Sequence, residues 1–328
     1  MNITIESAAT VYPENTISIN ELAIACQVPV DIIARTGIQC LHVASAGVLT
    51  SDMAADAVKK ALQGMNPKQL DQLVFISEGV SDYLYMDTSK CILKKINGRV
   101  DGSIYSYDYF RGGSGTIGII RMVGNQLAAN PFISVSAIVT SLLWEYHSNH
   151  RRIGDTFLGD GAGALILKAD GTRNRIRSIV TESLSQYNLA AGFKYGGTLN
   201  DLNQEVIRSH QFVWDVIDIT HYDGLLSKIV STAVAAGRKA LAAANLTASD
   251  IAIVGISGFL RDISDEILIE FPCNRVIDPL HDKGYLGSLG AIDLLEHFIN
   301  DDSIERGETM LAISVGVDVN VEALIIER

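Results

Sequence analysis

The sequence predicts an α/β fold made of two duplicated halves, and three features support this prediction. A helix, a turn and a strand occur at residues 59–77 and again at 238–257. Residues 73–77 (LVFIS) form a continuous apolar run, typical of a strand that is buried on both faces. Residues 107–131 pass from a strand through a glycine-rich bend into a helix, and the N-terminus of such a helix stabilises an anion. We expect one compact unit whose halves span residues 1–170 and 171–328, organised around this bend.

The expected elements follow one another along the first half of the chain. Strands are predicted at 2–10, 73–77, 103–109 and 133–140, and helices at 18–27 and 50–64, the second of them capped by Thr50 or Ser51. The small residues of Gly159 to Leu167 (GDGAGALIL) predict a hairpin at the core, where backbone segments approach closely.

The internal repeat is supported by individual matches. Ala61, Leu62, Asn66 and Asp71 correspond to Ala240, Leu241, Asn245 and Asp250, and Val74, Ile76 and Ser77 correspond to Val254, Ile256 and Ser257. Chance similarity of two alanine-rich helices is the alternative explanation. The matched strand follows each helix at almost the same distance, which favours duplication.

The composition indicates a globular, acidic protein. Its 328 residues are 48% hydrophobic, and 26 Lys and Arg stand against 38 Asp and Glu, for a net charge of −12. This balance disfavours nucleic acid as a partner. The chain has no apolar run of the roughly 18 residues that a membrane helix needs, and its first residues lack the positive charge of a signal peptide. We therefore expect a cytoplasmic protein with no membrane partner.

The four cysteines, Cys26, Cys40, Cys91 and Cys273, stand far apart without a CxxC pair or a histidine-rich companion. We expect them to be buried free thiols of a reducing compartment, and we expect no metal site.

Several motifs in this order resemble the β-ketoacyl-acyl-carrier-protein synthase III branch of the thiolase superfamily. They are ARTGIQCLH (34–42), TSDMAADAVKKAL (50–62), YDYFRGGSG (107–115), LGDGAGALIL (158–167), KGYLGSLGAIDLL (283–295) and SVGVDVNVEALII (314–326). The resemblance covers nearly the whole chain. It implies a five-layered αβαβα fold, a dimer, and acyl thioesters of coenzyme A or carrier protein as ligands.

The resemblance also implies where catalytic groups would stand. Family members hold an acyl group on a cysteine thiolate, and a histidine and an asparagine stabilise the enolate formed on decarboxylation. In this sequence the cysteine position falls on Gly113, the histidine position on Ser257 and the asparagine position on Tyr285. Glycine has no nucleophile, so we expect no acyl-enzyme by the family route and no catalytic residue among the three.

Cofactor binding is weakly supported by the same comparison. Arg35 matches an arginine that contacts coenzyme A in the family, but the tryptophan expected four residues earlier is Asp31. The glycine triplet expected near the C-terminus is reduced to Gly316, followed by Val317 and Asp318. We therefore predict no bound cofactor.

The first functional hypothesis is a catalytically silent subunit. It would support a triad-bearing ketosynthase III-like chain in a heterodimer or heterotetramer, with acyl carrier protein or acyl-CoA as further partners. In the family, the loop after the first buried strand borders the acyl tunnel of the neighbouring subunit. Here that loop is 78–91, with Tyr83, Leu84, Tyr85 and Met86 at its centre. Ordinary interface packing is the alternative role for these four side chains.

Two other hypotheses remain open. The chain could process thioesters with residues outside the family triad, and Ser114 is the candidate nucleophile. It misses the GxSxG elbow because Thr116 replaces the last glycine, so we expect Ser114 to cap the following helix instead. Alternatively, a homodimer could bind an acyl thioester without turning it over.

Overall fold

The computed structural model describes residues 3–79, 81–84, 86–110, 113–145, 147–169 and 171–328, apart from the side chains of residues 31, 32 and 35. The strands are β1 (Ile3–Val11), β2 (Thr16–Ser18), β3 (Cys40–His42), β4 (Gln72–Ser77), β5 (Tyr105–Phe110), β6 (Val135–Leu142), β7 (Arg152–Ile153), β8 (Thr156–Phe157), β9 (Gly161–Ala169), β10 (Arg175–Ser183), β11 (Gly192–Phe193), β12 (Trp214–Asp215), β13 (Ile253–Ser257), β14 (Val276–Ile277), β15 (Thr309–Val315) and β16 (Asn320–Glu327). The helices are α1 (Ile19–Cys26), α2 (Val30–Arg35), α3 (Thr50–Leu62), α4 (Thr88–Lys95), α5 (Thr116–Ala129), α6 (Gln204–Arg208), α7 (Ile219–Ala244), α8 (Arg261–Glu270), α9 (Leu280–Lys283) and α10 (Gly287–Asn300).

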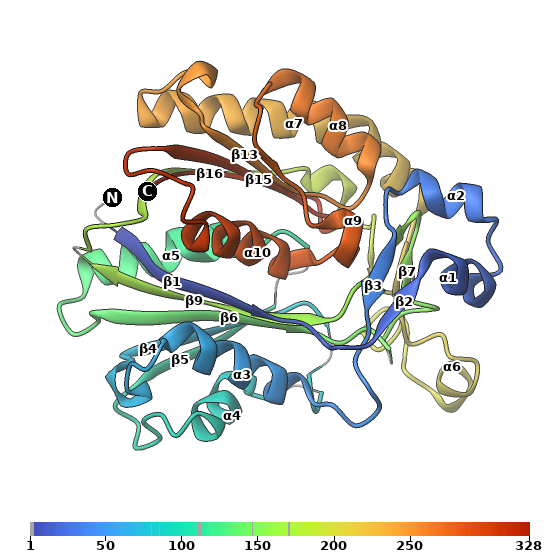
Figure 1. Cartoon of the computed structure of the whole chain (residues 1–328). Helices are drawn as coiled ribbons and strands as arrows, with labels where there is room; N and C mark the ends of the chain where they lie inside the picture. Colours follow the sequence, from blue (N-terminus) through green and yellow to red (C-terminus); the bar gives the residue numbers. More distant parts are fainter. Residues whose placement is uncertain (1–2, 80, 85, 111–112, 146, 170) are drawn as a thin grey trace.

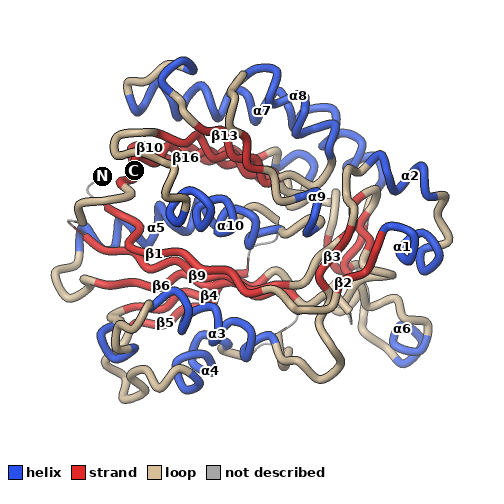
Figure 2. Tube along the Cα trace, viewed as in Figure 1, coloured by secondary structure: helices blue, strands red, loops and turns tan. Residues whose placement is uncertain are grey.

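The strands and helices form five layers. Ten strands are hydrogen-bonded in the order β14-β13-β15-β16-β10-β1-β9-β6-β4-β5, and the register of β1 with β10 pairs Thr4 with Arg175. Figure 1 shows the two ends of this order as separate sheet layers with α5 and α10 between them. Helices α7 and α8 cover the outer face of one layer, and α3 and α4 cover the other (Figure 2). The predicted αβαβα arrangement is confirmed.

The predicted repeat is present in the structure. Helices α3 and α7 are each followed by a short 3₁₀ turn, at 67–69 and 248–250, and then by the buried strands β4 and β13. Strand β4 lies parallel to β5 and β6, and β13 lies parallel to β14 and β15. On this symmetry we propose that the two halves meet at about residue 170.

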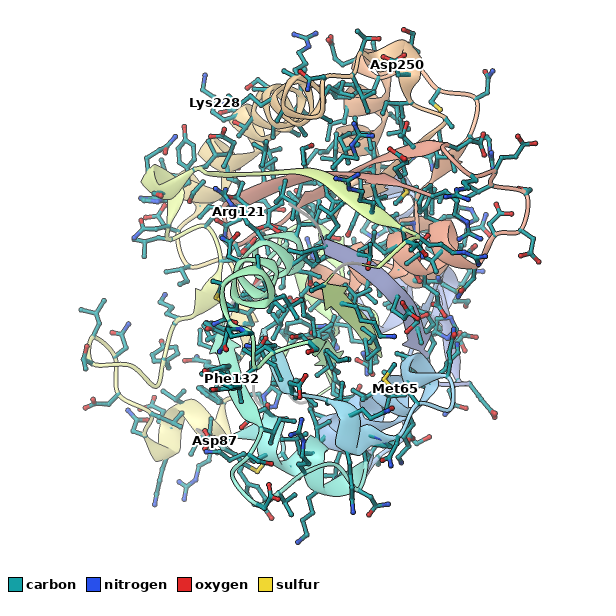
Figure 3. The ribbon with its side chains drawn as sticks, turned by 90° about the vertical axis from the view of Figure 1, so that its left-hand side faces the viewer. Met65, Asp87, Arg121, Phe132, Lys228 and Asp250 are labelled. Carbon is teal, nitrogen blue, oxygen red and sulfur yellow. The ribbon has the colours of Figure 1, made fainter. Side chains whose placement is uncertain are left out.

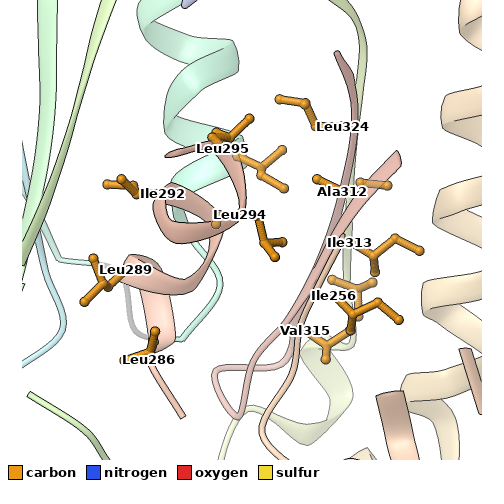
Figure 4. Close-up of a cluster of buried hydrophobic side chains, with 14 of the residues drawn as sticks. Ile256, Leu286, Leu289, Ile292, Leu294, Leu295, Ala312, Ile313, Val315 and Leu324 are labelled. Atoms are coloured by element: carbon orange, nitrogen blue, oxygen red, sulfur yellow. The ribbon is translucent and has the colours of Figure 1, made fainter. Parts of the chain in front are cut away.

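The central helix α10 packs tightly on both sheet layers. Leu294 faces the strands of the C-terminal half, where Ile313 and Leu324 lie (Figure 4). On the opposite side, a Cβ atom at Gly161 or Gly163 of β9 would overlap side chains of α10. The small residues of this segment therefore serve close packing, as the sequence indicated, but they begin the single strand β9 rather than form a hairpin.

Some local predictions were wrong. Thr50 is the first residue of α3, and neither Thr50 nor Ser51 caps it with its side chain. Instead, Asp82 accepts a hydrogen bond from the backbone N–H of Ser51 (3.0 Å), because the loop after β4 returns to this helix end. The four cysteines are free thiols, but each is partly exposed rather than buried. None of the described helices is long and apolar enough to cross a membrane.

Candidate functional site

The bend between β5 and α5 contains a glycine in a left-handed conformation. Gly113 has φ of +75°, a left-handed conformation that side-chain-bearing residues rarely adopt. Its backbone N–H donates a hydrogen bond to Oε2 of Glu78 (3.0 Å). Gly115 occupies the N-cap of α5 without a side-chain hydrogen bond. The bend thus directs one backbone amide toward the end of the neighbouring strand β4.

A carboxylate occupies the space beside Gly113. A Cβ atom built on Gly113 would overlap Oδ1 of Asp318, which also accepts a hydrogen bond from the backbone N–H of Ser114 (3.2 Å). Nδ2 of Asn320 donates to the other oxygen of Asp318 (2.7 Å) and holds the carboxylate in place. The position predicted to be emptied by the glycine is therefore filled by an acid from the loop between β15 and β16.

Glu78 is the central charged residue of this site, and the sequence-based prediction missed it. It directly follows β4, its side chain is buried, and its carboxyl accepts hydrogen bonds from the backbone N–H groups of Gly113 and Ser288. Burial raises the pKa of Glu78 from 4.5 to about 8. The hydroxyl of Ser288 and the two backbone amides oppose this rise, and the charge of Asp318 adds to it. A glutamate directly after a continuous apolar strand was the available signal.

Tyr285, at the predicted asparagine position, lies next to these acids. It is 1% exposed, and its ring lies edge-on to that of Phe259 with the centroids 5.8 Å apart. Burial raises the pKa of the Tyr285 hydroxyl well above 10, and the charges of Glu78 and Asp318 raise it further. At neutral pH Tyr285 is therefore a neutral phenol.

Ser257, at the predicted histidine position, ends β13 and is buried. Its Oγ contacts α10 so closely that a Cβ atom on Gly290 would overlap it. This contact makes Ser257 part of the packing between β13 and α10. The structure thus gathers Gly113 and Tyr285 around Glu78 and Asp318, and places Ser257 against the first turns of α10.

Ser114 does not cap α5, so that prediction was wrong. Its Oγ donates to the backbone carbonyl of Asn320 (3.0 Å) and lies 3.4 Å from Oδ1 of Asp318. Ser114 is 1% exposed. A buried hydroxyl bonded to a carbonyl oxygen is poorly placed to attack a thioester from solution.

The remaining predicted residues lie away from this cluster. Tyr83 and Leu84 are 73% and 53% exposed, Met86 is half-buried, and Tyr85 lies outside the described residues. Arg35 is the last residue of α2, but its side chain is also outside the described part of the chain. Among the described residues, no group of three His, Cys, Asp or Glu side chains could hold a metal ion.

A surface groove between α1 and residues 145–155 has two adjoining hollows. The larger, of about 660 Å³, is lined by apolar side chains such as Leu22, Ile207 and Phe212 and by polar ones such as Glu145 and Arg151. The smaller, of about 390 Å³, shares Asn149 and His150 with the first.

The smaller hollow differs in character, because it is lined by Arg152 and by the carboxyl groups of Asp155, Asp215 and Asp223. The described residues that line these two hollows do not include Gly113, Ser257 or Tyr285.

The layered architecture is that of a thiolase-like α/β fold. No family model matches the sequence. The chain is 24% identical over 324 residues to a β-ketoacyl-[acyl-carrier-protein] synthase III of Wolbachia pipientis wMel, covering 94% of both chains. It is 22% identical over 302 residues to the protein of the same name from Microcystis aeruginosa, covering 90% of this chain and 87% of that one.

Solved structures support the same fold. A 3-oxoacyl-(acyl-carrier-protein) synthase III superposes with a TM-score of 0.86 at 16% identity and full coverage of both chains. The synthase III of Aquifex aeolicus gives 0.81 at 15% identity, covering 99% of this chain and 100% of that one. Xanthomonas campestris OleA, solved as a point variant with bound lauric acid and lauroyl-CoA, gives 0.79 at 16% identity, covering 100% and 99%. The chain therefore has the fold of the synthase III proteins, and its relatives carry that name.

Proposed function

We propose that this chain is a catalytically silent β-ketoacyl-acyl-carrier-protein synthase III-like subunit. It supports a triad-bearing condensing partner in fatty-acyl or polyketide-type specialised metabolism. The observation that carries the proposal is the carboxylate of Asp318, which fills the space that a side chain at Gly113 would need. Gly113 has no side chain that could supply a thiolate nucleophile, and Asp318 occupies the space that such a side chain would need.

An exposed sheet edge offers a surface for the partner. Strand β5 ends the sheet order, and its side chains Tyr105, Tyr107 and Phe110 are exposed. An edge strand presents unpaired backbone N–H and C=O groups that another chain can bind.

The loop that carries Tyr83 and Leu84 also exposes two apolar side chains. Figure 3 views the side of the molecule where Phe132, which is 80% exposed, and Asp87 lie at the surface. Together, the edge and the loop provide the kind of apolar contact that a stable subunit interface needs.

Co-expression tests the proposal directly. Produced with a triad-bearing synthase III-like chain from the same gene neighbourhood, the protein should elute as a stable 1:1 complex. Replacing both Tyr83 and Leu84 with alanine should weaken the complex, whereas Leu199→Ala, which removes a 92% exposed leucine elsewhere, should not. A well-behaved homodimer that ignores every such partner would refute the proposal.

An assay of the isolated chain tests whether it lacks catalytic activity. Incubated with acyl-CoA and malonyl thioesters, it should release no free thiol above the rate in buffer. Thiol release that disappears in Ser114→Ala would instead support the hypothesis of an active enzyme that uses residues outside the family triad.

The groove beside α1 favours a second candidate function, the binding of an acyl thioester without turnover. Its larger hollow offers the apolar side chains of Leu22, Ile207 and Phe212 to an acyl or pantetheine chain. The three carboxyl groups of the smaller hollow would repel the phosphates of coenzyme A. An acyl-pantetheine, which has no phosphate, should therefore raise the Tm more than the matching acyl-CoA does; equal shifts of zero would remove this candidate.

A further inference from the structure

We infer that the backbone amides of Gly113 and Ser288 form a binding site for a carboxyl group, and that the protein fills this site with its own Glu78. This inference concerns the interior of the chain and holds whether or not a partner subunit exists. It identifies Glu78 as an internal ligand rather than as a catalytic acid.

The two donors come from separate parts of the chain and converge on one carboxyl group. The N–H of Gly113, just before α5, donates to Oε2 of Glu78 (3.0 Å), and the N–H of Ser288, in the first turn of α10, donates to Oε1. Both helix N-termini place positive potential at this point. One carboxyl group thus bridges the two central helices with one oxygen for each.

The backbone around the carboxyl is shaped to fit it. Gly113 and Gly287 have φ of +75° and +48°, and a Cβ atom on Gly287 would overlap the carboxyl oxygens of Glu78. Side chains also fix the peptide groups that bind it. Oγ1 of Thr116 donates to the carbonyl of Ser288 (2.6 Å), and the hydroxyls of Ser288 and Thr140 are 2.7 Å apart. A cradle this constrained binds a planar, two-oxygen group.

Burial completes the site. Glu78 is 1% exposed and Ser288 is fully buried, so water does not compete for the two amides. While Glu78 occupies them, neither donor is available to the carbonyl oxygen of a thioester. The chain therefore closes its own former pocket from within, and a single substitution at Gly113 does not reopen it.

Chemical rescue tests this inference. The variant Glu78→Ala loses the carboxyl and leaves the two amides free, so its Tm should fall well below that of the unmodified chain. Sodium formate or acetate should then raise the Tm of this variant in a saturable manner, by about 2 °C or more. Sodium chloride at the same concentration should not do so. The unmodified chain should show no saturable response to formate.

A second buried glutamate provides the control. Glu322 is also buried, and its Oε2 accepts a hydrogen bond from the N–H of Gly118 (3.0 Å) within α5. Glu322→Ala should lose stability without saturable rescue by formate. Equal rescue of both variants, or equal stabilisation of the unmodified chain, would show a general salt effect and overturn the inference.

If Glu78→Ala does not fold, Glu78→Gln keeps the side-chain volume and allows a spectroscopic test. In the full-length chain, the amide proton resonances of Gly113 and Ser288 should shift as Glu78 titrates, and that pH dependence should vanish in Glu78→Gln. The amide of Gly118 serves as the reference, because its acceptor is Glu322. Identical pH profiles of Gly113 and Ser288 in both proteins would also overturn the inference.

Discussion

The bends that lead into the two central helices have similar backbones but different side-chain neighbours. Each has a glycine at positive φ followed by a buried serine, at Gly113 and Ser114 before α5 and at Gly287 and Ser288 at the start of α10. In each bend, one backbone N–H donates a hydrogen bond to the carboxyl group of Glu78. Only the first bend is also packed against Asp318.

This difference shows how a duplicated frame supports two unequal sites. Both helix N-termini attract negative charge, because their amides point inward and their dipoles add to the field. Two acids from other parts of the chain, Glu78 after β4 and Asp318 before β16, accept hydrogen bonds from the backbone amides of the first bend. The following predictions test the two bends against each other.

The largest effect is expected from side chains at the two glycines. Gly113→Cys should lower the free energy of unfolding by roughly 2 to 5 kcal/mol, because the new Cβ meets Asp318 in a left-handed backbone. Gly287→Ala should cost a similar amount through its contact with Glu78. Urea unfolding measures both.

A second substitution distinguishes the two bends. Adding Asp318→Gly should recover part of the loss in Gly113→Cys and none of the loss in Gly287→Ala. Equal recovery in both backgrounds would mean that Asp318 does not specifically close the first bend.

The next effect concerns pH. Glu78 has a pKa of about 8 in the folded protein against 4.5 as its ordinary value. The folded chain therefore holds this proton more tightly than the unfolded chain does. Its stabilising contribution is complete below about pH 4.5 and is lost as the pH rises to about 8.

The slope should reach about 1.4 kcal/mol per pH unit between these limits. Subtracting the profile of Glu78→Gln from that of the unmodified chain removes the titration of the other groups. A flat difference between pH 5 and 8 would contradict the assignment.

A smaller shift is expected from Asp318→Asn. The negative charge of Asp318 contributes to the raised pKa of Glu78, so its removal should lower that pKa. The upper end of the pH-dependent range should then move from about pH 8 to a lower pH. It should stay above 4.5, because burial is the larger cause of the raised pKa of Glu78. An unchanged profile would place the two carboxyl groups too far apart to interact.

The smallest effect is expected from the two serines. Ser114→Ala removes the hydrogen bond to the carbonyl of Asn320. Ser288→Ala removes the hydrogen bond with Thr140 and the hydroxyl group that interacts with Glu78. Each should cost about 1 kcal/mol of stability. A much larger loss in Ser114→Ala would reveal a role that its described contacts do not explain.

Much of the fold could be predicted from the sequence because its signals are local. The apolar run of β4, the repeated helix and strand, and the glycines of β9 each report on their own segment. The resemblance to synthase III then supplied the layer order that these segments adopt.

The composition of the candidate site could not be predicted in the same way. Glu78 lies 35 residues from Gly113, and Asp318 lies 204 residues from Ser114, so only the folded chain brings these acids to the bend. The hydroxyl of Ser114 likewise finds its acceptor in Asn320, at the start of β16, rather than in the helix that follows it. Sequence spacing identified Gly113 but gave no indication of what fills the space beside it.

The six-residue edge strand β5 also affects how this polypeptide is made in a cell. Aromatic side chains on a strand with free backbone groups are a template for aberrant pairing between newly synthesised copies. A companion that covers the edge soon after translation removes that hazard. We expect the yield of properly folded material to rise with the supply of the companion, and inclusion bodies to accumulate when the chain is overproduced by itself.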